Sequence, residues 1–197
     1  MSEQKSQPIV FLKSNRVILR PVLKEDIPSL TKWVNDPEIL PFLGRYLPVM
    51  EADEEEWFNN LHKRKPNHIV LAIIADEKII GTMGLHRISM KDRVATTGAL
   101  IGEKDYWGKG YGSEAKMILL DYAFNTLNLR KICSFVIAFN ERSYKYSLKC
   151  GYKEEGRQRK HIYRFGKYWD QIFLAVFKED WLPLWKEFSK EHNITNL

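Results

Sequence analysis

The chain has 197 residues, which suits one compact domain, and 44% of them are hydrophobic, which excludes a disordered chain. Two cysteines exclude a disulfide framework and a cysteine-rich zinc site, and the longest apolar stretch is far short of the roughly 20 residues that span a bilayer. Lys and Arg exceed Asp and Glu by 31 to 25, a net charge of +6 that suits an anionic ligand but is weak evidence for nucleic-acid binding. With no secretory signal visible, we expect a cytoplasmic protein that has no membrane partner and no nucleic-acid partner.

The first half of the chain predicts a strand, two helices and three further strands. Ile27, Leu30 and Val34 recur at helical spacing, and Asp36-Pro37 ends that helix. The three later strands are separated by short turns, which indicates antiparallel hairpins. In chain order we expect a strand at Asn15–Arg20, helices at Lys24–Asn35 and from Glu51 to about Arg64, and strands at His68–Ala75, Lys78–Ile88 and Arg93–Glu103.

The second half begins with a glycine-rich turn, Gly108–Gly112, which is followed by apolar residues at helical spacing from Ala115 to Ala123. Ile132–Phe139 is then almost continuously apolar, as expected for a strand buried on both faces. A strand, a helix and a strand in this order predict a parallel crossover unit. The remaining elements are expected to be a helix at Asn140–Cys150, a hairpin of Tyr152–Phe165 and Lys167–Phe177, and a terminal helix at Trp181–His192. This order predicts an α/β (α+β) protein with a mixed sheet covered by helices.

The glycine-rich turn has the physical properties of an anion site. It precedes a helix whose first backbone N–H groups have no partner and whose dipole adds partial positive charge. Glycines let the backbone approach an anion closely, Lys109 adds a charge, and a pyrophosphate is the natural ligand. The spacing excludes a Walker A loop, because Gly110 follows the lysine, and it differs from the dinucleotide fingerprint. The alternative is that the glycines merely form a tight turn.

Four segments occur in the same order as in a known family. The segment Tyr106-Trp-Gly-Lys-Gly-Tyr-Gly-Ser-Glu-Ala115 resembles the acetyl-CoA pyrophosphate loop of the GNAT acetyltransferases, in particular that of the ribosomal-protein-alanine and spermidine N-acetyltransferases. The resemblance extends to Asn140–Tyr152, to Tyr163–Asp170 and to Asn15–Pro21. It implies a mostly antiparallel sheet with a splayed parallel strand pair and helices on both faces. We expect one GNAT domain over residues 9–180 and a helical tail over residues 181–197.

The resemblance also implies acetyl-CoA as the co-substrate and assigns residues to it. Its pantetheine arm would pair with the backbone of Leu100, Ile101 and Gly102, where a backbone N–H near Leu100–Ile101 would also stabilise the thioester oxyanion. Asn140 and Ser143 would contact the cofactor beyond the second splayed strand. The Gln or Arg that often opens the loop in relatives is replaced here by Trp107. The pyrophosphate would bind the amides of Gly108, Lys109, Gly110, Tyr111, Gly112 and Ser113.

The chemistry requires a base and an acid. An amine attacks only when it is neutral, so a base should take its proton, and Glu103 at the end of the cofactor strand is the first candidate. His86 and Asp170 are further candidates, although a packed or surface position explains either of them. The leaving thiolate needs a proton, which many relatives supply from a Tyr seven residues after the Asn. Ser147 has that position here and is the candidate acid, directly or through water, and the alternative is a proton from solvent. The neighbouring Tyr144 and Tyr146 are expected to point elsewhere on the helix.

The acceptor is the part that the sequence determines least. A protein N-terminus, a polyamine and an amino sugar all suit such a pocket, and Phe42, Tyr46 and Trp169 are candidate lining residues that suit a core equally well. The acidic run from Glu51 to Glu56 either attracts a basic acceptor or, as we favour, stabilises the first turn of a helix. We predict an N-acetyltransferase that transfers acetyl from acetyl-CoA to a primary amine by direct attack on the thioester. The alternative is a non-catalytic acyl-CoA-binding sensor or scaffold, and the oligomeric state is left open.

Overall fold

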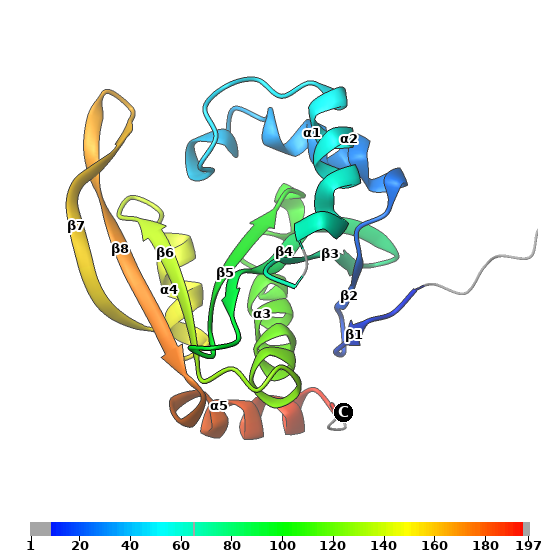
Figure 1. Ribbon diagram of the computed structural model, residues 1–197, viewed down its shortest axis with the longest axis vertical. Helices are drawn as coiled ribbons and strands as arrows, with labels where there is room; N and C mark the ends of the chain where they lie inside the picture. Colours follow the sequence, from blue (N-terminus) through cyan, green and yellow to red (C-terminus); the bar gives the residue numbers. More distant parts are fainter. Residues whose placement is uncertain (1–8, 65, 195–197) are drawn as a thin grey trace, which may run out of the picture.

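The computed structural model describes residues 9–64 and 66–194, which form one mixed sheet with helices on both faces (Figure 1). The strands lie side by side in the order β1-β2-β3-β4-β5-β6-β8-β7. Their bounds are β1 (Leu12–Lys13), β2 (Ile18–Pro21), β3 (Ile69–Ala75), β4 (Lys78–Ser89), β5 (Val94–Ile101), β6 (Lys131–Ile137), β7 (Lys153–Arg164) and β8 (Lys167–Phe177). The α-helices are α1 (Ile27–Val34), α2 (Glu51–Asn60), α3 (Tyr111–Asp121), α4 (Glu141–Lys149) and α5 (Lys178–Glu191).

Two hydrophobic cores lie on opposite faces of this sheet. Leu71 and Ile73 of β3 belong to the larger core, whereas Ala72 between them belongs to the smaller one. Successive residues of a strand point to opposite faces, so the two cores are separated by the sheet. The larger core packs against α3 and α5, and the smaller core packs against α1 through Leu30 and Trp33. The prediction of helices on both faces is therefore confirmed.

The parallel strand pair separates part of the way along its length. β5 and β6 are in register from Val94 opposite Lys131 to Thr96 opposite Cys133, and β5 continues to Ile101 while β6 continues to Ile137. Beyond Thr96, β5 pairs with β4 and β6 pairs with β8, so the two halves of the sheet diverge. This confirms the splayed pair, and it leaves one edge of each strand free to bind a ligand.

One strand was not predicted, and the last helix begins earlier than predicted. β1 is a two-residue strand paired with β2, too short for alternation to show in the sequence. α5 begins at Lys178 rather than at Trp181, because the Lys178 N–H donates to the Arg130 oxygen at 3.0 Å and its ammonium donates to the Phe124 oxygen at 3.0 Å. Trp181 is fully buried in the larger core, so this helix is part of the main packing.

The proposed division into residues 9–180 and 181–197 stays a prediction, and its last three residues lie outside the described part of the chain. Among the residues that the structure describes, no helix is both long and apolar enough to span a bilayer.

Candidate functional site

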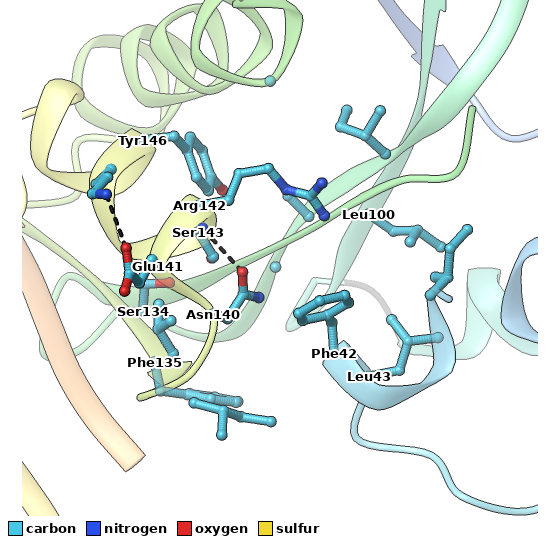
Figure 2. A pocket seen from close by; sticks show the side chains of 18 of the residues that line it. Phe42, Leu43, Leu100, Ser134, Phe135, Asn140, Glu141, Arg142, Ser143 and Tyr146 are labelled. Atoms are coloured by element: carbon cyan, nitrogen blue, oxygen red, sulfur yellow. Dashed lines mark hydrogen bonds and ion pairs between the residues drawn. The ribbon is translucent and has the colours of Figure 1, made fainter. Parts of the chain in front are cut away.

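A cavity of about 1040 Å³ lies where β5 and β6 diverge. Its walls come from both strands, the glycine-rich loop before α3, α4, the loop between α1 and α2, and the β7–β8 hairpin. Figure 2 shows the lining side chains of β5, β6, α4 and the α1–α2 loop. The cavity thus brings together segments that are far apart in the sequence. The predicted cofactor residues that line it are Leu100, Ile101, Gly108, Gly110, Gly112, Ser113, Asn140 and Ser143.

The glycine-rich loop presents free backbone N–H groups to this cavity. Gly108 and Gly110 have φ values of +74° and +89°, a left-handed conformation that favours glycine. Gly110 is the N-cap of α3, and no side chain caps that helix end. In the described part of the chain, the N–H groups of residues 108–113 donate to no main-chain oxygen. The loop therefore has the unpaired donors and the helix dipole that an anion requires.

A buried ion pair holds this loop in place from the other side. The carboxylate of Glu114 accepts hydrogen bonds from the hydroxyl of Ser14 at 2.7 Å and from the backbone N–H and the Nε of Arg16, each at 2.8 Å. Burial alone would raise the pKa of Glu114, but these hydrogen bonds and the Arg16 charge lower it below its ordinary value. The Arg16 guanidinium lies over the Tyr111 ring and donates to the Lys109 carbonyl oxygen at 3.3 Å, and neither Lys109 nor Tyr111 lines the cavity.

Arg142 crosses the cavity between α4 and the glycine-rich loop. Its guanidinium lies 3.7 Å from the ring centroid of Trp107 and 5.6 Å from that of Phe42, and Figure 2 shows the side chain extending from α4 towards Leu100. Burial lowers the pKa of this guanidinium, which nevertheless stays charged at neutral pH. Arg142 was not among the residues predicted from the sequence. The available signal was Trp107, which replaces a cationic or amide residue of the loop and provides the ring on which Arg142 stacks.

Asn140 and Ser143 lie beside Arg142 at the start of α4. The Asn140 side chain caps the helix by accepting a hydrogen bond from the Ser143 N–H at 3.1 Å. Both residues line the cavity at the point where β6 ends. The cap fixes the position of the first turn of α4, and so it fixes the position of Arg142.

A buried lysine lies behind the wall of the cavity. The Lys116 ammonium donates to the Thr97 hydroxyl at 3.0 Å and lies 5.0 Å and 5.1 Å from the ring centroids of Tyr146 and Tyr152. Burial opposes its charge, but its two tyrosine neighbours favour the charge and raise the pKa of Lys116. Thr97 and Tyr146 line the cavity, so the charge of Lys116 is separated from the ligand space by one layer of side chains.

The prediction that Tyr146 points away from the site is wrong. Tyr146 lines the cavity, whereas Ser147 on the next helical position is buried and its hydroxyl has no hydrogen-bond partner among the described residues. Consecutive residues of a helix are rotated by about 100°, so the two side chains point in different directions. In this orientation the Tyr146 ring contacts the Lys116 ammonium on one side and lines the cavity on the other.

Glu103 is likewise not part of the cavity lining. Its carboxylate accepts hydrogen bonds from Lys78 at 2.9 Å and from the Trp33 indole at 3.0 Å, and the Lys78 bond lowers the pKa of Glu103 despite partial burial. The Gly102 N–H donates to the Ile80 oxygen at 2.9 Å and is therefore not free for a ligand, and the cofactor role of Gly102 stays a prediction. The catalytic roles of Glu103 and Ser147 stay predictions, and this geometry does not favour them.

The far end of the cavity, near the β7–β8 hairpin, is aromatic. Phe42 and Tyr46 from the α1–α2 loop line it together with Tyr163 from the hairpin. Behind them, Phe139 contacts the rings of Phe42 at 5.6 Å and Trp169 at 5.1 Å between centroids. Trp169 therefore supports the wall without lining the cavity. A ligand with a phosphate group at the glycine-rich loop would place its other end between the diverging strands, facing this aromatic region.

Comparisons with known proteins agree with this chemistry. Residues 16–153 match a family model described as an acetyltransferase (GNAT) domain. The putative ribosomal N-acetyltransferase YdaF of Bacillus subtilis (strain 168) is 30% identical over 152 residues, which cover 77% of this chain and 80% of the relative. The spermidine N(1)-acetyltransferase of Escherichia coli (strain K12) is 25% identical over 171 residues, which cover 86% and 90%. The structure of spermidine N-acetyltransferase from Vibrio cholerae in complex with CoA and spermine shares the fold, with a TM-score of 0.78 and 23% identity over 85% of this chain and 98% of that chain.

Proposed function

Because the chain belongs to the GNAT acetyltransferase family, we propose that its cavity binds acetyl-CoA and an amine together and transfers the acetyl group by direct attack. Membership of the family confirms two predictions, namely an N-acetyltransferase and acetyl-CoA as its co-substrate. The observation that carries the proposed mechanism is the continuity of one cavity from the free N–H groups of the glycine-rich loop to the gap between β5 and β6.

The pyrophosphate of CoA is proposed to bind the loop amides of residues 108–113, with Arg142 as an added cation. A guanidinium forms charge-assisted hydrogen bonds to phosphate oxygens, and the Arg142 guanidinium stacks on Trp107, which directly precedes the glycine-rich loop. Arg142 would thus supply the charge that relatives often place at the start of the loop. Asn140 and Ser143 would contact the cofactor next to it.

The pantetheine arm is proposed to lie along the free edge of β5. Leu100 and Ile101 line the cavity there and have no partner on β6 in the described register. Because the Gly102 N–H is used by Ile80, the backbone contacts would fall on residues 98–101 rather than on Gly102. A free N–H in this stretch would also stabilise the oxyanion that forms on the thioester carbonyl.

In the reaction step, the neutral amine nitrogen attacks the thioester carbonyl and a C–N bond forms. The C–S bond then breaks, the nitrogen loses one proton, and the CoA sulfur gains one, which leaves an acetamide and the free thiol. We propose Tyr146 as the proton donor to sulfur, since it lines the cavity and Ser147 does not. The Lys116 charge behind Tyr146 would stabilise negative charge on either the phenol or the thiolate.

Thermal unfolding in the presence of acetyl-CoA tests the cofactor proposal. A ligand that binds the folded state raises the melting temperature, and at 100 times its Kd the stabilisation is about 2.7 kcal/mol. Gly110→Glu should abolish the shift, because the new carboxylate would enter the anion site, whereas Gly156→Ala on β7 should keep it, since a Cβ there meets no neighbour. A flat response of the native protein up to millimolar acetyl-CoA would contradict the proposal.

The second candidate is a non-catalytic acyl-CoA-binding module. It is favoured by one observation, namely that neither Glu103 nor Ser147 is part of the cavity lining. Release of free thiol from acetyl-CoA in the presence of amines separates the two candidates. Turnover with any amine excludes the non-catalytic module, and tight cofactor binding without turnover over a broad amine panel supports it.

A further inference from the structure

We propose that the acceptor of this site is a monoamine attached to an aromatic or other apolar group, and that polyamines are poor substrates. The inference rests on the proposed function, because it concerns the acceptor end of the same cavity. It is supported by the sign of the charges that line the cavity, by the pairing of the carboxylates beside it, and by the aromatic rings exposed at its mouth.

The charged side chains that line the cavity are mostly positive, namely Arg142, Lys145, Lys149 and Arg164. In the part of the chain that the structure describes, Glu141 is the one carboxylate in the lining, and it accepts a hydrogen bond from Lys145 at 2.9 Å. This lining suits the anionic phosphates of CoA. It offers no free anionic partner to the second and third ammonium groups of a polyamine, and an unpaired cation close to fixed cations is unfavourable.

The carboxylates of the α1–α2 loop, which borders the acceptor end, are already paired. Asp36 and Glu38 each lie 2.8 Å from the Lys104 ammonium, and the bond from Lys104 lowers the pKa of Asp36. At the start of α2, Glu54 is buried against Arg45 at 2.6 Å, and Asp53 caps the helix by accepting from the Met50 N–H at 2.8 Å. In the described part of the chain, no residue from Glu51 to Glu56 lines the cavity, so the acidic run gives the cavity no anionic wall for a polyamine.

The mouth of the cavity instead presents aromatic surface. Tyr46 and Tyr163 line the cavity and remain 75% and 55% exposed. Arg164 donates to the carbonyl oxygens of Pro41 at 3.3 Å and Leu43 at 3.0 Å, so the hairpin and the α1–α2 loop are fastened together around this surface. Exposed rings gathered in a concave site are the surface that an apolar ligand covers.

The CoA phosphates would offset the cations of α4, but the Arg164 charge at the acceptor end also favours the reactive form of a monoamine. An alkylamine with a pKa near 10 is mostly protonated at neutral pH, and fixed positive charges nearby lower that pKa. The neutral form is the nucleophile, so a cavity of this sign reduces the need for a dedicated base. This agrees with the position of Glu103 outside the lining.

The experiment compares 2-phenylethylamine with spermidine in two measurements. Isothermal titration of each amine, with and without saturating CoA, gives its Kd, and thiol release from acetyl-CoA gives its kcat/KM. We expect 2-phenylethylamine to bind at least about 10-fold more tightly and to react at least about 10-fold more efficiently, a difference of about 1.4 kcal/mol. An equal or lower Kd or an equal or higher kcat/KM for spermidine, or no binding of either amine, would overturn the inference.

Preferential binding of 2-phenylethylamine without thiol release from any amine would have a different meaning. It would support the inferred class of acceptor and overturn the proposed function instead.

A matched pair of variants tests the charge argument directly. Tyr46→Glu places a carboxylate at the exposed mouth, and Tyr46→Gln places a neutral side chain of similar size there. We expect the glutamate variant to use spermidine at least about 5-fold more efficiently than the glutamine variant, because it supplies the missing counter-charge. Both variants should lose efficiency with 2-phenylethylamine, since both remove an aromatic ring. Equal spermidine efficiency in the two variants would count against the inference.

Discussion

The two ends of the cavity are built in different ways. The proposed phosphate end is built around the backbone N–H groups of one continuous segment, the loop before α3, and the side chains of Arg142, Asn140 and Ser143 lie beside it. The acceptor end consists of side chains from the α1–α2 loop and the β7–β8 hairpin, which meet through the bonds of Arg164. A segment that binds through its backbone needs the rest of the chain to hold its position, as Ser14 and Arg16 do through Glu114, whereas an end assembled from distant side chains can change its ligand by substitution.

The largest expected effect is a loss of stability where the end of β5 packs against α1. In Gly102→Ala the new Cβ would lie 1.9 Å from the Trp33 ring of α1, so the helix and the end of β5 must move apart. Overpacking of this kind costs about 3 kcal/mol in the free energy of unfolding. Urea unfolding measures it, with Gly156→Ala as the control, which has open space around its Cβ and should change stability by less than about 1 kcal/mol. Equal stabilities of the two variants would show that the Trp33 ring can move aside with no loss in the free energy of unfolding.

The next effect separates chemistry from binding. Tyr146→Phe removes the proposed proton donor but keeps the ring beside Lys116, so kcat should fall about 100-fold with little change in KM. Tyr144→Phe is the control, because the Tyr144 hydroxyl bonds to Glu154 and its ring is not part of the cavity lining. An unchanged kcat would assign protonation of the thiol to another group.

Substitution of Arg142 tests whether this side chain binds the cofactor or the amine. Arg142→Ala should weaken acetyl-CoA binding about 10- to 100-fold, since a charge-assisted hydrogen bond contributes about 1.5–3 kcal/mol. Lys145→Ala should have a smaller effect, because that lysine is exposed and paired with Glu141. Titration calorimetry with acetyl-CoA measures both. A change in amine affinity without a change in cofactor affinity would place Arg142 at the acceptor end instead.

The smallest effect is a pH dependence of stability at the base of the loop. The pKa of Glu114 is lowered in the folded state, so its contribution is fully present above the unfolded value near 4.5 and is lost as pH falls below it. Glu114→Gln should destabilise the protein by about 1–2 kcal/mol at pH 7, and this deficit should shrink at lower pH. Thermal unfolding from pH 7 to pH 3 shows whether the two curves converge. Curves that stay parallel would mean that the Glu114 charge contributes nothing to stability.

The contrast between the two ends also explains what the sequence alone could predict. The glycine-rich loop, the crossover helix and the hairpins depend on local patterns, and the mixed sheet with its splayed pair is confirmed. Arg142 and the orientation of Tyr146 depend on contacts with Trp107 and Lys116, which are distant in the chain, and no local pattern shows them. Lys116 itself lies within an apolar helical pattern that gives no sign of a buried charge.

The gap between β5 and β6 has a mechanical consequence. The two strands pair through three residue pairs, from Val94–Lys131 to Thr96–Cys133. The two halves of the sheet are therefore joined at one end of these strands and separated at the other. A molecule that forms hydrogen bonds with the free edges of β5 and β6 acts as an extra strand and links the two halves of the sheet. Amide hydrogen exchange in Gly98–Ile101 and Ser134–Ile137 should therefore slow on binding, which makes the sheet itself a reporter of occupancy.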